Sequence, residues 1–313
     1  MVNQISDTIL MIRPVAFHKN EETAVNNYFQ ENTTKSDAFV QGHALKEFDQ
    51  MVAALRKEGV NVIVVEDTAL PETPDSIFPN NWISFHANGD IVLYPMFAPN
   101  RRKERRLDIL ERLRPDFEVN EVHHLTNWEA QSEFLEGTGS LILDRQNKVA
   151  YAALSDRTHQ AVITAFEEKS GYKVVQFVAN QSVDGRRLPI YHTNVMMAVG
   201  EQFSVICLDT IDNPGERKKV ETSLQATGKE IIELTEAQIH QFAGNMLQVQ
   251  NHNHEKFVVM SEAAFQCLDE EQKKRLSAHG QLIHSPIPTI EKLGGGSVRC
   301  MMAEVFLPHL AQA

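Results

Sequence analysis

The sequence predicts an α/β fold made of five similar units of about 55 residues that close into a ring. Three observations support this prediction. Polar residues begin strand-like stretches at nearly constant intervals, helical segments lie between these stretches, and the first and last strands of the chain each lack a neighbour in sequence. Regular alternation of helices and strands is the plainer interpretation of this pattern, and the residue types at the strand starts argue against it.

The strand starts recur at intervals of 55, 56, 53 and 55 residues. They are Asn81, Glu136, His192, Asn245 and Cys300. In the first four stretches a polar turn, such as "HANGD" or "NHNHEK", separates two β-rich runs, which is typical of a hairpin. We therefore expect each unit to begin with a strand that follows a polar residue.

Helical segments complete the units. Apolar residues at helical spacing predict helices within residues 37–59, 155–171, 214–228 and 261–280. A short β-rich run follows each helix, at residues 61–67, 172–178, 230–234 and 281–286. Each unit is thus expected to have the order ββαβ.

The two ends of the chain are expected to pair. The run "DTILMIRPVAF" is a strand without a preceding partner, and "CMMAEVFLP" is a strand without a following one. Their pairing would close the ring and bring the five polar strand starts to one end of a central channel.

Composition indicates an ordinary globular protein. The chain has 313 residues, of which 42% are hydrophobic and 23% charged, and no linker rich in Gly, Ser or Pro divides it, so we expect one domain over residues 1–313. The net charge of -12 argues against nucleic acid or an anionic membrane as a partner. The first residues lack a secretory signal, no run of about 18 apolar residues is present, and three cysteines give no disulfide framework. A cytosolic protein is expected.

The polar strand starts suit cysteine chemistry. A cysteine attacks as its thiolate, which a neighbouring imidazolium favours, and Cys300 follows a run of three glycines. His192 can supply that charge and then transfer protons, because the ordinary pKa of histidine lies near neutrality. Glu136, beside two glycines in "EGTGS", can orient the histidine or accept hydrogen bonds from substrate nitrogen. Singly, each residue is more often a core or capping residue, so their shared place in the repeat carries the prediction.

Several motifs in one order resemble a known family. "GGGSVRCM", "EGTGS" and "YHTN" are similar to the motifs around the nucleophilic cysteine, the glutamate and the histidine of the guanidino-group-modifying enzymes of the pentein fold. "LSDRT" and "FPNNW" are similar to its Ser-x-Arg-Thr and Phe-x-x-Asp segments, and "NRRKER" to the stretch that carries an arginine for the substrate carboxylate. The resemblance covers nearly the whole chain. It implies a five-bladed α/β propeller of ββαβ units around a pseudo-fivefold axis, without a metal or organic cofactor.

The resemblance also implies roles for single residues. Cys300 would be the nucleophile, His192 the general acid and base, and Glu136 the carboxylate that contacts substrate nitrogen. Arg157, with Arg101 or Arg102, would hold the substrate carboxylate by paired hydrogen bonds. For the arginines in "NRRKER", a solvated helix face is an equally good interpretation.

Two departures from the deiminase pattern bear on the substrate. Asn81 and Asn194 stand where the deiminases have aspartates, and an amide offers one acceptor and two donors. This suits a neutral ureido group better than a buried guanidinium, which would lose its compensating charge. We therefore expect hydrolysis of citrulline to ornithine, carbon dioxide and ammonia, as in the citrulline utilisation hydrolase branch that the sequence resembles more closely. If Asp75 rather than Asn81 occupies the position of the deiminase aspartate, the sequence instead predicts a guanidino substrate.

Other functions remain open from the residues. An arginine deiminase or an amidinotransferase fits the same motifs, and a non-catalytic pentein that binds other molecules is a second class. A metal-dependent hydrolase is suggested by "NHNHE" at residues 251–255 and by His123 with His124, although the first lies in a hairpin turn and the second lacks a nearby carboxylate. The expected partner is a small amino-acid substrate, and a homo-oligomer is left open.

Overall fold

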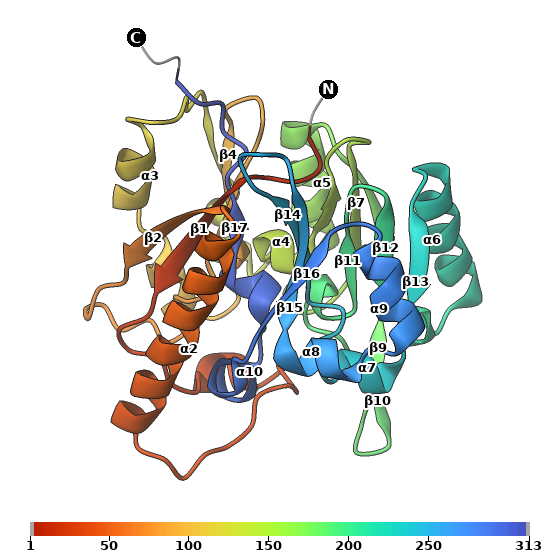
Figure 1. Ribbon diagram of the computed structural model, residues 1–313, viewed down its shortest axis with the longest axis horizontal. Helices are drawn as coiled ribbons and strands as arrows, with labels where there is room; N and C mark the ends of the chain where they lie inside the picture. Colours follow the sequence, from red (N-terminus) through yellow and green to blue (C-terminus); the bar gives the residue numbers. More distant parts are fainter. Residues whose placement is uncertain (1–2, 311–313) are drawn as a thin grey trace.

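Five three-stranded sheets of one topology form the fold in the computed structural model, which describes residues 3–310 (Figure 1). In four sheets the strands follow in sequence order, and the first pairs antiparallel with the second, which pairs parallel with the third. They are β3 (Ile83–Phe85), β4 (Ile91–Leu93) and β5 (Val122–His124); β6 (Ile142–Asp144), β7 (Val149–Ala153) and β8 (Lys173–Phe177); β11 (Met197–Val199), β12 (Phe203–Ile206) and β13 (Glu230–Glu233); and β14 (Leu247–Gln250), β15 (Lys256–Ser261) and β16 (Gln281–Ser285).

The fifth sheet joins the two ends of the chain. β17 (Ala303–Glu304) pairs antiparallel with β1 (Thr8–Arg13), and β1 pairs parallel with β2 (Asn61–Glu66). Ile9 lies opposite Glu304 in this register. The expected pairing of the first and last strands is therefore confirmed, and the fifth unit has the same ββαβ order as the others once the ring is closed.

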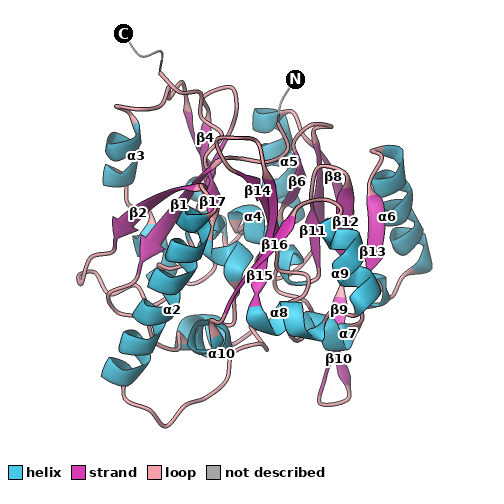
Figure 2. Ribbon diagram, in the orientation of Figure 1, coloured by secondary structure: helices cyan, strands magenta, loops and turns pink. Residues whose placement is uncertain are grey.

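Helices connect the second and third strands of the units, and Figure 2 shows α3 and α6 at opposite edges of the molecule. These connecting helices are α2 (Asp37–Lys57), α3 (Asp108–Leu113), α5 (Gln160–Ser170), α6 (Pro214–Ala226), and the pair α8 (Glu262–Cys267) and α9 (Glu270–Ser277). The longest, α2, buries Val40, Phe48, Met51 and Leu55. Its apolar face packs against strand β16 and short helix α10 (Pro288–Gly294).

Three details differ from the sequence prediction. The helix expected over 261–280 is two helices, because Asp269 caps α9 in a capping box and interrupts the first. The helix expected over 155–171 begins only at Gln160. A hairpin that was not predicted, β9 (Asn180–Val183) with β10 (Arg186–Pro189), lies between the second and third units and projects at the bottom of Figure 1.

Short helical turns lie immediately before four of the first strands; two of them contain the polar strand starts Asn81 and Cys300, and the other two directly follow Glu136 and His192. They are η1 (Pro79–Asn81), α4 (Gly137–Ser140), η4 (Thr193–Val195) and η6 (Val298–Met301). α4 contacts both η1 and η4, and η1 contacts η6. The first strands also meet one another, since β17 contacts β3 and β11 contacts both β6 and β14. The repeat therefore gathers residues from distant parts of the sequence at one end of the ring.

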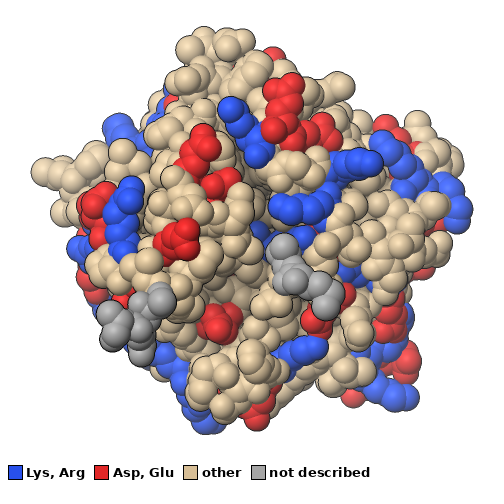
Figure 3. Space-filling view, turned by 90° about the horizontal axis from the view of Figure 1, so that it is seen from above, with Lys and Arg blue, Asp and Glu red and all other residues tan. Residues whose placement is uncertain are grey.

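Acidic and basic side chains are interspersed over the face seen in Figure 3. Among residues 3–310, no helix combines the length and the apolar character needed to cross a bilayer.

Candidate active site

A small cavity of about 10 Å³ lies where the turns meet. Residues from distant parts of the sequence line it: Thr23, Asn27, Asp75, Phe78, Asn81, Arg101, Arg157, Tyr191, His192, Gly294, Gly295, Gly296 and Cys300. Six of the residues that the sequence singled out are in this lining, namely Cys300, His192, Asn81, Arg157, Arg101 and Asp75. The other two, Asn194 and Glu136, lie directly behind it, bonded to Cys300 and His192.

Cys300 lies in the turn η6 and is 3% exposed. Its Sγ accepts two hydrogen bonds, from Nδ2 of Asn194 and from Nδ2 of Asn245, each 3.2 Å long. A Cβ atom on Gly296 would lie 3.4 Å from the Cβ of Cys300, so the glycine run passes close to the thiol. Among the hydrogen bonds of residues 3–310, none joins Cys300 to His192.

His192 and Glu136 form a buried pair in which Nε2 of the imidazole lies 2.7 Å from Oε2 of the carboxylate. Burial would raise the pKa of Glu136, but the charge of Arg157 and the hydrogen bond from His192 lower it to about 2. Burial, opposed by Glu136, lowers the pKa of His192 to about 4. The imidazole is therefore neutral at pH 7. Because an ionised carboxylate only accepts, Nε2 carries the ring proton and Nδ1 is the free base.

Gly139 separates Asn81 from His192. A Cβ atom on Gly139 would lie 2.4 Å from Nδ2 of Asn81 and 2.8 Å from Nδ1 of His192, so only glycine leaves room for both side chains. The Oδ1 atom of Asn81 accepts a hydrogen bond of 2.8 Å from Arg101, which is only a donor. This contact fixes the amide orientation. Nδ2 of Asn81 is consequently a buried donor without a hydrogen-bond partner.

Arg101 lines the cavity, whereas Arg102 does not. Nε and Nη2 of Arg101 each lie 2.9 Å from the carboxylate of Glu104, and burial raises the pKa of that carboxyl despite the arginine. Arg102 instead binds the carbonyl oxygens of Met96 and Phe97 on the outer side. Of the two arginines considered for the substrate carboxylate, only Arg101 is therefore in position to contact a molecule in the cavity. Most of its N–H donors already have partners within the protein.

Arg157 is held by a segment that covers the cavity, residues 18–36, hereafter the cover. Nε of Arg157 donates to Oδ1 of Asn26 over 2.9 Å, and Nη2 donates to the carbonyl of Thr23 over 2.8 Å. Its Nη1 lies 3.5 Å from Glu136, and its guanidinium lies over the ring of Tyr191 with 4.9 Å to the centroid. The hydrogen bonds of Arg157 therefore hold the cover closed.

Asp75 is also bound to the cover, through one of its two oxygens. Oδ2 accepts from Nδ2 of Asn20 over 2.8 Å and from the hydroxyl of Thr23 over 3.2 Å. Oδ1 is buried and has no hydrogen-bond partner. Asp75 and Asn81 line the same cavity, so the structure brings both of the alternative substrate-binding positions together.

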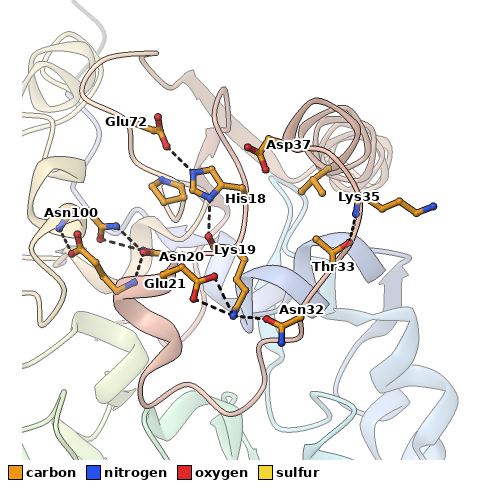
Figure 4. A pocket seen from close by; sticks show the side chains of 13 residues that line it. His18, Lys19, Asn20, Glu21, Asn32, Thr33, Lys35, Asp37, Glu72 and Asn100 are labelled. Atoms are coloured by element: carbon orange, nitrogen blue, oxygen red, sulfur yellow. Dashed lines mark hydrogen bonds and ion pairs between the residues drawn. The ribbon is translucent and has the colours of Figure 1, made fainter.

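A larger hollow of about 550 Å³ lies on the other side of the cover. Figure 4 shows its lining, in which His18 meets Glu72, Lys19 meets Glu21 and Asn32, and the amides of Asn20 and Asn100 pair. Asn20 also donates to Asp75, which lines the small cavity at Cys300. The cover is thus the wall between the two spaces.

The residues that sequence reasoning missed are mostly on the cover. Thr23, Asn26 and Asn27 contact the site, and Asn27 donates to the carbonyl of Gly295. Their stretch, "NEETAVNNYFQEN", has neither helical nor strand periodicity, and its richness in asparagine is the only signal. Tyr191, whose hydroxyl donates to the same carbonyl, was overlooked although it precedes His192 directly.

The histidines considered for a metal have other contacts. Nε2 of His123 lies 3.1 Å from Asp90 and Nδ1 lies 3.2 Å from Glu121. Nδ1 of His252 faces the carbonyl of Gly59. Within residues 3–310, no group of three or more His, Cys, Asp or Glu side chains is placed to hold a metal ion.

Solved structures with the same fold include several hydrolases. The arginine dihydrolase ArgZ of the ornithine-ammonia cycle in cyanobacteria is 18% identical in sequence to this protein, with a TM-score of 0.73. The match covers 97% of this chain and 41% of the ArgZ chain, so this protein spans less than half the length of ArgZ. The N-terminal domain of ArgZ bound to product is 18% identical with a TM-score of 0.72, over 96% of this chain and 99% of that one. A dimethylarginine dimethylaminohydrolase, solved as an adduct with S-methyl-L-thiocitrulline, is 15% identical with a TM-score of 0.61. That match covers 97% of this chain and 99% of the other.

These similarities confirm the α/β pentein fold that the sequence predicted. No curated protein sequence matches the chain. A family model described as "N,N dimethylarginine dimethylhydrolase, eukaryotic" matches residues 13–307, which is nearly the whole length. The citrulline branch that the sequence resembles is not among these findings. The chain belongs to the N,N dimethylarginine dimethylhydrolase family.

Proposed function

We propose that this protein is a cysteine-dependent hydrolase that cleaves a carbon–nitrogen bond in the side group of a ureido amino acid, with citrulline as substrate. The products would be ornithine, carbon dioxide and ammonia. The proposal combines two parts: the chemistry of a nucleophilic cysteine with a histidine–glutamate pair, and a substrate choice set by the amides around them.

The free donor of Asn81 is the observation that carries the substrate choice. Its Nδ2 is buried, and Arg101 occupies the other end of the amide, so the amide cannot turn to offer an acceptor without losing that hydrogen bond. A guanidinium has only N–H groups and would place donor against donor. A ureido group has a carbonyl oxygen, which satisfies Asn81 and avoids the cost of leaving a buried donor unpaired, about 1–3 kcal/mol.

The remaining free atoms suit the nitrogen side of a ureido group. Oδ1 of Asp75, in the lining of the cavity, is a buried acceptor without a partner, and Oδ1 of Asn194 is a second one directly behind the lining. Nδ2 of Asn194 already donates to Cys300, so the oxygen is the end of this amide that is left free. One free donor and two free acceptors match the one acceptor and the several N–H donors of –NH–CO–NH2.

In the proposed reaction, Sγ of Cys300 adds to the ureido carbon and Asn81 donates to the oxyanion that forms. His192, which is neutral at rest, takes up the proton that the thiol loses and gives it to the leaving δ-nitrogen, so that ornithine departs and a carbamoyl thioester remains. Water that His192 deprotonates then cleaves the thioester. The carbamate released breaks down to carbon dioxide and ammonia.

A second candidate is an arginine hydrolase, which would form citrulline and ammonia. The specific observation in its favour is the buried carboxylate of Asp75 in the same cavity, because a carboxylate compensates a guanidinium. The names of the similar structures, an arginine dihydrolase and a dimethylarginine dimethylaminohydrolase, refer to guanidino compounds. An amidinotransferase would require an acceptor amine as well.

Product analysis separates these functions. The purified protein is incubated separately with citrulline, arginine and asymmetric dimethylarginine, and amino acids, ammonia and dimethylamine are measured by chromatography. We expect ornithine and ammonia in equal amounts from citrulline. Intact citrulline together with consumed arginine would refute the substrate choice and support the second candidate.

The Cys300→Ser variant serves as the control for the nucleophile. We expect it to lose all turnover while keeping the thermal unfolding temperature of the wild type within a few degrees. Undiminished turnover by this variant would refute the mechanism for every substrate tested.

A further inference from the structure

Asn245 begins the fourth unit, yet neither the motifs nor the proposed reaction gives it a role. It is fully buried in the loop before β14 and does not line the cavity. Its Nδ2 donates to Sγ of Cys300 over 3.2 Å and to the carbonyl of Asn194 over 3.0 Å. The side chain thus touches the reacting sulfur from outside the substrate space.

The orientation of this amide is fixed by its surroundings. Oδ1 of Asn245 accepts a hydrogen bond of 3.0 Å from the backbone N–H of Arg299, the residue directly before Cys300. Because a backbone N–H only donates, the oxygen must face Arg299 and the nitrogen must face the sulfur. One side chain therefore holds the turn that carries the nucleophile and points a donor at its sulfur.

Asn194 presents the second donor to the same atom. Its Nδ2 also lies 3.2 Å from Sγ, and its side chain is as buried as that of Asn245. Two amide donors on one sulfur stabilise a thiolate much more than a thiol, because hydrogen bonds to an ionised acceptor are roughly twice as strong as those to a neutral one. In the described residues the histidine makes no hydrogen bond to this sulfur.

We propose that Asn245, together with Asn194, forms a two-donor pocket that stabilises the thiolate of Cys300 relative to its thiol. The inference rests on the proposed function, since it assumes that Cys300 is the nucleophile. It assigns the stabilisation of the charged sulfur to two neutral amides, while His192 takes up the proton that the thiol loses. Asn245 then acts on the reaction through the sulfur and does not contact the substrate.

The test is the rate at which iodoacetamide alkylates Cys300 as a function of pH, measured without substrate. Quantification of the peptide that contains Cys300 by mass spectrometry separates it from Cys207 and Cys267. The main variant is Asn245→Asp, which keeps an acceptor for the N–H of Arg299 but replaces the donor by a carboxylate. Asn245→Ala removes the donor without adding charge, and it decides the outcome if the Asp variant does not fold.

We expect the alkylation rate at pH 7 to fall roughly tenfold or more in either variant, since a lost hydrogen bond to a charged group is worth about that factor. The pH of half-maximal rate should rise by about one unit. A purely structural role would change access to the sulfur and lower the rate at every pH without moving that midpoint. An unmoved midpoint, or a rate within twofold of the wild type, would overturn the proposal.

Asn251→Ala is the matched control. Asn251 is a buried asparagine of the same unit, and its amide binds the carbonyl of Glu58 and the carboxylate of Glu255 away from the site. Its alkylation profile should equal that of the wild type. The alkylation assay needs no substrate, so its outcome is separate from that of the proposed function. If the alkylation midpoint shifts in the Asn245 variants but the wild type does not turn over citrulline, only the substrate choice is refuted. If the wild type turns over citrulline but the midpoint does not shift, only the role of Asn245 is refuted.

Discussion

Replacing Asn81 with Asp changes one atom of the site from a donor to an acceptor. The Oδ1 atom that accepts from Arg101 over 2.8 Å is kept, so the contact that fixes this side chain survives. The atom that replaces Nδ2 no longer donates and carries part of a negative charge. Gly139 still leaves room for it, because the two side chains have nearly the same shape.

The size of the effect follows from what the free donor is proposed to do. Loss of one donor to a developing oxyanion lowers kcat by about 10²–10³, or about 3–4 kcal/mol. The new carboxylate is buried and shares Arg101 with the ionised Glu136, since Nη1 of Arg101 lies 2.8 Å from Oδ1 of Asn81 and 4.0 Å from Oε2 of Glu136, and its charge adds repulsion against an oxyanion. Arg101 offsets part of this repulsion, so we expect kcat/KM for citrulline to fall about 10²-fold or more. A guanidinium would gain the acceptor that it lacks, and activity on arginine should rise or stay constant.

The assay is steady-state ammonia release with each substrate, expressed as the ratio of kcat/KM for citrulline to kcat/KM for arginine. Asn80→Asp makes the same change one residue earlier, in a buried side chain that binds Thr138 and does not line the cavity. That control should lower stability without altering the ratio. If Asn81→Asp leaves citrulline turnover within threefold of the wild type, the donor of Asn81 does not select the substrate.

Three further predictions concern the shape, the charge and the closure of the site. Gly139→Ala should abolish activity and lower the melting temperature, because its Cβ would clash with the side chains of Asn81 and His192. The control Gly42→Ala lies in helix α2, where a Cβ would have no atom within 4 Å. In thermal denaturation it should stabilise the fold by about 0.5–1 kcal/mol. The free energy of unfolding should fall by on the order of 3 kcal/mol as the pH drops from about 6.5 to about 4, because the unfolded state protonates His192 at a higher pH than the folded state does. In urea titrations over this pH range, the His192→Gln variant should not show this decrease in the free energy of unfolding. Asn26→Ala should lower KM by about twofold to tenfold because it frees Arg157, and an increase in KM would show that the contact assists binding.

The ring and the chemical groups were predictable because both are periodic in the sequence. The near-constant spacing of the five strand starts reflects one supersecondary unit that repeats, and β1 pairs with β17 as the unpartnered ends suggested. Once the spacing is accepted, the meeting of Cys300 and His192 in one cavity follows from symmetry. The hydrogen bonds of Asn245 are a consequence of the same symmetry, although the residue type alone did not reveal them.

The substrate-binding half of the site was not predictable in the same way. Residues 18–36 have no periodic pattern, and their contacts with Asp75 and Arg157 join positions 55 and 131 residues apart in sequence. The pairing of Arg101 with Glu104 is local, but it became visible only with the fold, because burial is what gives this pair its importance. The cytosolic location stays a prediction.

The division between ring and cover has a consequence for how substrate is bound. Cys300, His192, Asn81 and Asn194 are held by turns of the ring, so their geometry does not depend on the cover. Asp75 and Arg157 use their hydrogen bonds to hold the cover, and the cavity beneath it has room for about one water molecule. On the proposed function, the amino-acid substrate can bind only if the cover moves. Its carboxylate then replaces the cover's asparagine at Arg157, and Asp75, released from Asn20 and Thr23, is available to the ureido N–H groups. Part of the binding energy is therefore used to open the site, which raises KM without touching the groups that carry out the reaction.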